Sequence, residues 1–314
     1  MESTLFQSLR SEPVANIRKA IRAGSYKGHT AGLGSGVLQA NLAILPEEAA
    51  LDFMRFCQRN PKPCPLVGVS DTGNPHLPTL SPEIDIRFDV PAYYIYRDGK
   101  LESEANDIGT IWNERLVTFA LGCSFTFEHA LIKAGIALWH IDNDSTVPMF
   151  RTNIQTVPAG PFFGPLVVSM RAIPEALVDL AVDISHHFPL AHGAPIHIGS
   201  PEKIGIAEIY RPDWGDPAPV PAGSVPVFWA CGVTPQVALE TAGVPLCITH
   251  KPGHMLITDI LEDAEIPVLN SNQPNTNQTP TKQTKGKKHE EDSPDDDRSD
   301  NCIACFGRRS LGRW

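Results

Sequence analysis

The chain lacks a run of about 18 apolar residues, the length that a bilayer-spanning helix needs, so we expect no membrane partner. Basic residues are scarce: 26 Lys and Arg stand against 36 Asp and Glu, for a formal net charge of −10. Binding to nucleic acid needs a basic surface, so no nucleic-acid partner is expected. The first residues lack a basic segment followed by an apolar one, and the seven cysteines are an odd number. Both features predict a cytoplasmic protein with free thiols.

Two common signatures are also missing. The Gly-rich segment GLGSGVLQAN contains no GxGxxG after a strand, which argues against a dinucleotide site; we expect a loop there. No internal repeat is apparent. Proline, in contrast, is abundant at 29 of 314 residues, roughly twice its usual share of about 5%. This disfavours a helical bundle and indicates short elements joined by fixed turns.

The composition changes near residue 263. From there the chain is polar and highly charged, with almost no large apolar residues before Ile303. Such a segment cannot bury enough surface to offset the entropy of ordering it. The sequence therefore predicts a folded domain over 1–262 and a disordered polar tail over 263–314.

Apolar spacing and proline positions predict helices that alternate with short apolar strands. The predicted helices are 11–24, 46–58, 107–120, 126–134 and 174–187. The predicted strands are 165–170, 194–198, 225–230, 245–249 and 255–260. This alternation is typical of an α/β protein, and we expect a mixed sheet with helices on both faces.

Cys123 and Glu128 lie at the start of a predicted helix and are candidate catalytic residues. A helix N-terminus lowers the pKa of a thiol and binds anions. The alternatives are a buried, inert cysteine and a solvated acid in a first helical turn.

A carboxylate ligand is suggested by two arginines. Arg151, Thr152 and Asn153 follow one another, and Arg171 ends an apolar segment. Because a guanidinium grips a carboxylate with two hydrogen bonds, all four are candidate substrate-binding residues. The alternative for each arginine is a surface salt bridge.

Two further segments carry candidate site residues. A predicted strand ends at the corner formed by Gly232, Val233 and Thr234, whose backbone N–H groups suit an anion or an oxyanion. Cys231 precedes this corner but lacks the GxSxG flanks of a nucleophile elbow, so we favour the corner over the thiol. His250 and His254 bracket a turn, where either could transfer a proton or merely bond to the backbone. Their spacing is not that of a helical metal site, and we expect no metal.

Several long segments resemble the D-glutamate cyclase family, whose stand-alone microbial members are called "putative hydro-lyases". The resemblance runs from about Ser11 to Ile260. It is carried by GCSFTFEHALIKAGI, VPMFRTNI, GPLVVSMRAIP, HGAPIHIG, GSVPVFWACGVTPQ and ITHKPGHMLITDI.

This resemblance implies an α/β fold of two intertwined subdomains and a lyase that acts on a small amino or oxo acid. The animal relative converts D-glutamate to 5-oxo-D-proline and water, a reaction that needs no redox or carbanion cofactor. That relative also has a second, C-terminal domain, which we do not expect in this chain. We therefore expect a small carboxylate substrate and no cofactor, with a homo-oligomer compatible with the sequence. The alternatives are a hydrolase that opens 5-oxoproline and a non-catalytic protein that binds an anionic metabolite.

Overall fold

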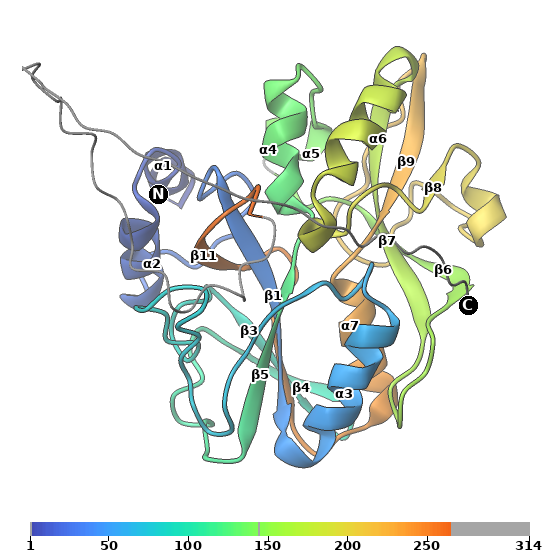
Figure 1. The fold of residues 1–314 in the computed structure, drawn as a ribbon. Coiled ribbons are helices and arrows are strands. Elements are labelled where there is room, and N and C mark those ends of the chain that lie inside the picture. The colour runs from blue at the N-terminus through green and yellow to red at the C-terminus, as the bar shows by residue number, and fades with distance from the viewer. Residues whose placement is uncertain (1, 144, 265–314) are drawn as a thin grey trace, which may run out of the picture. The chain divides into compact units, whose positions relative to one another are not determined.

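The computed structural model describes residues 2–143 and 145–264, which form two antiparallel sheets with helices packed around them (Figure 1). The predicted tail lies, from residue 265, outside the described residues. The seven-stranded sheet has the order β2 (Leu66–Val69), β5 (Leu116–Gly122), β1 (Val37–Pro46), β10 (Cys247–His250), β3 (Tyr93–Arg97) and β4 (Lys100–Ala105), and β11 (Leu256–Leu261) also pairs with β1. The four-stranded sheet has the order β6 (Met149–Gln155), β7 (Pro165–Pro174), β9 (Ser224–Ala230) and β8 (His197–Ile198).

The helices complete an α/β fold, as the sequence predicts. They are α1 (Glu2–Leu9), α2 (Val14–Arg22), α3 (Glu47–Arg59), α4 (Phe125–Lys133), α5 (Trp139–Asp142), α6 (Val178–His186) and α7 (Val233–Ala242). Helices α2, α3, α4 and α6 confirm four of the predicted helices. The five predicted strands correspond to β7, β8, β9, β10 and β11.

The predicted helix over 107–120 is wrong. Turns occupy most of 106–115, and Leu116–Gly122 form β5. Every residue of β5 is buried, because the strand lies between β1 and β2 and its side chains pack in two separate core clusters. Apolar spacing alone cannot distinguish a strand that is buried on both faces from the apolar stripe of a helix. Here the pairing with strands that are distant in sequence determines the structure.

Several strands were not predicted. Residues 37–41, the second half of the expected Gly-rich loop, belong to the central strand β1, and the segment around Arg151, where no strand was predicted, is β6. A hairpin joins β3 to β4 through Asp98 and Gly99, whose φ angles of 48° and 76° are both positive. An Asp-Gly pair is a strong signal for the two-residue turn of a hairpin and could have revealed it.

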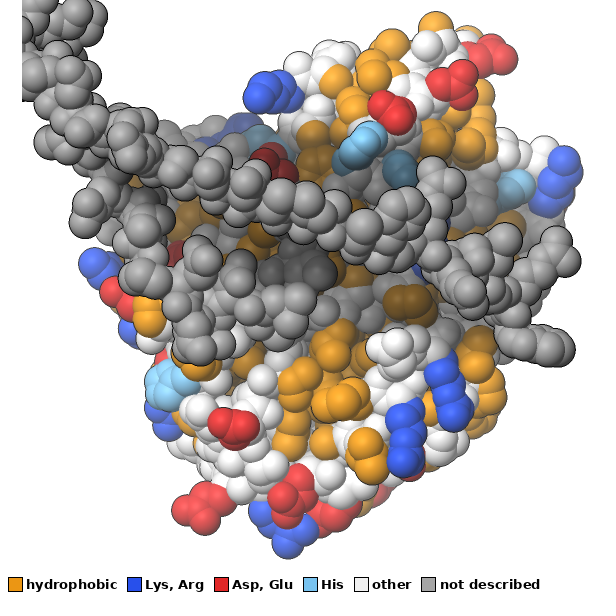
Figure 2. All heavy atoms as spheres, in the orientation of Figure 1, with side chains coloured by type: hydrophobic (Ala, Val, Ile, Leu, Met, Phe, Trp, Pro, Cys, Tyr) orange, Lys and Arg blue, Asp and Glu red, His pale blue; other side chains and the backbone are white. Residues whose placement is uncertain are grey.

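Helix α3 is correctly predicted, but the helical spacing of Leu51, Met54 and Cys57 indicates a different apolar face from the one that is buried. Phe53, Phe56 and Cys57 are the buried residues, whereas Leu51 and Met54 are exposed. Figure 2 shows apolar side chains gathered on the surface over the region where Figure 1 places α3. The aromatic rings of Phe53 and Phe56 fill the core better than the aliphatic pair.

The helices that follow β5 and β9 each pack against the sheet to which the preceding strand does not belong. Helix α4 follows β5 of the seven-stranded sheet, but its Phe127 and Leu131 pack with Trp229 of the four-stranded sheet. Helix α7 follows β9 of the four-stranded sheet, but its Ala238 and Leu239 pack in the core of the seven-stranded sheet. The halves are therefore intertwined, with α4 and α7 in opposite parts of the view in Figure 1.

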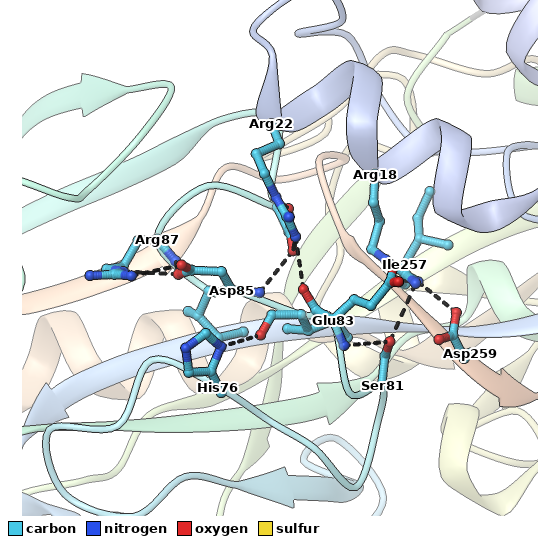
Figure 3. Close-up of polar contacts among 12 residues, drawn as sticks. Arg18, Arg22, His76, Ser81, Glu83, Asp85, Arg87, Ile257 and Asp259 are labelled. Carbon is cyan, nitrogen blue, oxygen red and sulfur yellow. Dashed lines mark hydrogen bonds and ion pairs between the residues drawn. The ribbon is translucent and has the colours of Figure 1, made fainter.

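Helix α2 is anchored by two arginines (Figure 3). The guanidinium of Arg18 is buried and pairs with Asp259 at 2.7 Å, while donating to the carbonyl of Ile257. Arg22 donates two hydrogen bonds to Asp89 at 2.7 and 2.6 Å. These pairs fix the helix to β11 and to the segment before β3.

Substitution of Gly122 tests how closely the backbone packs at the end of β5. A Cβ atom there would overlap the backbone carbonyl of Leu190, which cannot move aside as a flexible side chain could. We expect Gly122→Ala to lower the free energy of unfolding by at least about 3 kcal/mol, the upper range for overpacking. Urea denaturation measures the loss.

Gly223→Ala is the matched control, because Gly223 has a φ of 79° and open space around it. It should cost only the backbone strain of about 1–2 kcal/mol. Equal losses for the two variants would contradict the steric argument.

Candidate active site

Two strand-to-helix corners share one hydrogen-bond pattern. At the first, where β5 leads into α4, the Cys123 N–H donates to the Gln39 carbonyl of β1 at 3.1 Å. At the second, where β9 leads into α7, the Cys231 N–H donates to the Val167 carbonyl of β7 at 3.0 Å. Each cysteine is the link between a central strand and the helix that crosses to the other half.

The helix starts match as well. The hydroxyl of Thr126 accepts the Gln39 N–H at 3.2 Å, and that of Thr234 accepts the Val167 N–H at 3.0 Å. Each threonine N–H in turn donates to the carbonyl of its corner cysteine. The common sequence is only Cys-x-x-Thr, which explains why no repeat is visible in the sequence. The fold nevertheless contains the same corner twice.

Both corners face one pocket. The lining residues include both corners, the middle of β1, the end of β10 and the segment that leads into β6. They are Asn41, Cys123, Ser124, Phe125, Thr146, Val147, Met149, Cys231, Gly232, Val233, His250, Pro252, Gly253 and Met255. The structure therefore brings together Cys123, Gly232, Val233 and His250 of the predicted site residues.

The two thiols have similar surroundings. Burial raises the pKa of Cys123 to about 12, although the Phe125 N–H opposes the rise. Burial also raises the pKa of Cys231 to about 11, against the N–H groups of Val233 and Gly232. The charge of Arg171 lowers both pKa values without reversing the effect of burial. Both side chains are thiols at neutral pH, which for Cys123 agrees with the alternative of a buried cysteine and not with a thiol pKa lowered by a helix start.

Asn41 joins the two corners. Its amide donates to the carbonyl of Gly122 at 2.8 Å and to that of Leu121 at 3.3 Å. The same side chain lies against Gly232, where any Cβ atom would overlap it. Residue 232 must therefore be glycine for the second corner to lie this close to Asn41. Asn41 lines the pocket and was not among the site residues predicted from the sequence.

Glu128 and Arg171 form a buried ion pair beside the pocket. Glu128 Oε1 accepts from Arg171 Nε at 2.9 Å and also from Nη2, and it lies 2.9 Å from His140 Nε2. Arg171 also donates to the hydroxyls of Ser124 and Ser169, each at 3.0 Å. Burial alone would raise the pKa of Glu128, but His140 and Arg171 outweigh it and lower the pKa to about 2.

These contacts define what the pair can do. Glu128 is an ionised carboxylate whose Oε1 is already occupied, and neither Glu128 nor Arg171 is among the pocket-lining residues. Their effect on a ligand is through the position of Ser124 and through the field of the guanidinium.

His250 presents a fixed tautomer to the pocket. Its Nδ1 accepts the Leu42 N–H at 3.0 Å, so the ring hydrogen is on Nε2. Burial lowers the pKa of His250 to about 4, so the ring is neutral at pH 7. His254 lies beyond the turn, with Nδ1 3.0 Å from the Pro252 carbonyl, and does not line the pocket.

The other predicted residues occupy different positions. Arg151 is exposed on β6, where it pairs with Asp213 at 3.1 Å and stacks on Trp214. Thr152 donates to the Leu166 carbonyl, and Asn153 packs against Gly205. Thr234 is buried behind its corner, bonded to β7. None of these four residues lines the pocket.

Within residues 2–143 and 145–264, no three His, Cys, Asp or Glu side chains gather as a metal ion requires. No helix there is long and apolar enough to cross a membrane.

The ion pair leads to a prediction about stability. Glu128→Gln should lower the free energy of unfolding by about 3–5 kcal/mol at pH 7, because it leaves the Arg171 charge buried without its partner. The difference should shrink as the pH falls below about 4.5. Because the folded-state pKa is depressed, the wild type itself loses the carboxylate's contribution between about pH 4.5 and pH 2.

Urea titrations at pH 7 and pH 3.5 measure both values. Glu208→Gln, at an exposed position, is the matched control and should change little at either pH. A Glu128→Gln deficit that stays constant with pH would contradict the depressed pKa.

Comparison with known proteins agrees with the resemblance seen in the sequence. The D-glutamate cyclase family profile matches residues 117–259, which include both corners. A protein of Dinoroseobacter shibae named "Putative hydro-lyase" is 68% identical over 275 residues, covering 88% of this chain and 92% of its own length. A relative with the same designation from Ruegeria pomeroyi is 66% identical over 268 residues, covering 85% of this chain and 98% of its own. The chain therefore belongs to the D-glutamate cyclase family.

Proposed function

We propose that this protein is a lyase that cyclises D-glutamate to 5-oxo-D-proline with release of water. The observation that carries the proposal is the pair of equivalent corners, which direct the N-termini of α4 and α7 to a single pocket. A helix N-terminus attracts an anion through its free N–H groups and the positive end of its dipole. Two such ends in one pocket suit a small dicarboxylate, and glutamate carries two carboxylates.

The corners differ in a way that would orient the substrate. The α4 corner includes Ser124, whose hydroxyl is held by the Arg171 guanidinium, so it suits the α-carboxylate that stays anionic. The α7 corner includes the N–H groups of Gly232 and Val233 beside His250 and suits the carboxyl that reacts.

The reaction requires three tasks at that second corner. The amine of glutamate must lose a proton and attack the side-chain carboxyl, donors must stabilise the tetrahedral oxyanion, and one oxygen must leave as water. The N–H groups of the α7 corner and Nε2–H of His250 are suitable donors for the oxyanion. Since His250 is neutral and its Nδ1 is occupied, we assign it a hydrogen-bond donor role rather than that of a general base.

Incubation with D-glutamate, and separately with L-glutamate, tests the proposal. We expect loss of primary amine and the appearance of 5-oxoproline by NMR, starting from D-glutamate. Starting instead from 5-oxo-D-proline tests the ring-opening direction. A thermal shift with D-glutamate but no turnover in either direction would contradict the enzyme and support a binding protein.

Substitutions of two histidines, one inside the pocket and one outside it, test the assigned role of His250. His250→Gln removes the Nε2–H donor, and we expect kcat to fall by about 10²–10³-fold, the usual effect of losing one oxyanion donor. His254→Gln is the control, because His254 lies outside the pocket, and should leave kcat unchanged. Steady-state kinetics with D-glutamate measure both. A larger loss for His254→Gln than for His250→Gln would overturn the assignment.

A further inference from the structure

The pocket is lined by more titratable side chains than the one hydrogen-bond donor that the proposed function assigns to it. Among the described residues that line it, three side chains titrate: Cys123, Cys231 and His250. His250 uses Nδ1 to accept a backbone N–H and therefore offers only a donor. Glu128 is held by Arg171 and His140, outside the lining. The two thiols are thus the groups available to take up and deliver protons.

The thiols are also equivalent in their backbone geometry. Each follows a central strand, donates its N–H to the neighbouring strand and precedes a helix whose threonine returns to that strand. One comes from the seven-stranded sheet and the other from the four-stranded sheet, and both belong to one apolar cluster. The two are close enough that Cys231 contributes to the raised pKa of Cys123. A ligand held between the corners would have one thiol from each half beside it.

A reaction confined to one side of a substrate does not call for two equivalent acid–base groups. Inversion of a carbon centre does, since a proton must leave one face and another must arrive on the opposite face. We propose that Cys123 and Cys231 exchange the hydrogen on Cα of the bound dicarboxylic amino acid from its two faces and so interconvert its D and L forms. This inference rests on the dicarboxylate substrate of the proposed function, but it adds a second activity.

The step balances without a cofactor. The reaction starts from the small fraction of molecules in which one of the two cysteines has lost its proton to water. That thiolate takes the Cα proton, and the C–H electron pair passes to Cα and its carboxylate as an enediolate. The S–H bond of the other cysteine breaks, its proton joins Cα on the opposite face, and its sulfur becomes the thiolate. The N–H groups at the helix start stabilise the added charge on the carboxylate. Burial that makes each thiol hard to ionise also makes its thiolate a strong base.

The test uses the full chain with D-glutamate and with L-glutamate in D₂O. Proton NMR follows loss of the Cα–H signal, and chiral chromatography follows the enantiomer. We expect deuterium at Cα and formation of the opposite enantiomer from either starting form, with no change in samples without protein. Cys123→Ser and Cys231→Ser should each reduce inversion by about 10²–10⁴-fold, the usual contribution of a positioned acid or base.

Cys247→Ser is the control, because Cys247 is a buried thiol of β10 that does not line the pocket, and it should keep the inversion rate. The wild-type measurement in D₂O decides the proposal even if a corner variant fails to fold. Formation of 5-oxoproline with Cα–H fully retained would overturn this inference and leave the proposed function intact. Exchange without 5-oxoproline would support the inference and remove the cyclase. The absence of both reactions would overturn both.

Discussion

The buried ion pair between Glu128 and Arg171 is the contact on which the geometry of the pocket depends. Glu128 is on α4, which continues the seven-stranded sheet, whereas Arg171 is on β7 of the other sheet. Burying two charges is costly, and only good geometry with further hydrogen bonds offsets the cost. Here His140, Ser124 and Ser169 supply those bonds. Because Ser124 begins α4, the pair positions one corner against the half of the molecule that contains the other.

Charge presents a second constraint, since the protein has a net charge of −10 and a dicarboxylate would be repelled at long range. Attraction must then be local. The N-termini of α4 and α7 supply partial positive charges, and Arg171 supplies a full one whose field reaches both thiols. Glu128 neutralises much of that charge, so backbone N–H groups become the principal hydrogen-bond donors to an anion. Under the proposed function, this explains how the pocket could bind a carboxylate without an arginine among its lining residues.

Local signals predicted much of the fold and part of the site. Helices α2, α3, α4 and α6 follow from proline positions and apolar spacing, and the corner at Gly232 follows from a strand that runs directly into a helix. The strand β5 did not follow, because only its pairing with β1 and β2 distinguishes it from a helical stripe. The tautomer of His250 depends on Leu42, more than 200 residues away in sequence. Asn41 gave no local signal, since its role is to touch both corners at once.

The two corners are alike in backbone but not in side chains, and the difference bears on direction. Ser124 at the first corner is bonded to a cation, whereas its equivalent at the second is Gly232, whose missing side chain makes room for Asn41. Asn41 and Ser169 occupy matching positions, two residues beyond Gln39 and Val167, yet one reaches across to the opposite corner and the other supports Arg171. A symmetric pocket would accept glutamate in either orientation. Under the proposed function, the cation beside one corner and the neutral amide and imidazole beside the other favour the orientation that leaves the α-carboxylate ionised and exposes the side-chain carboxyl to attack.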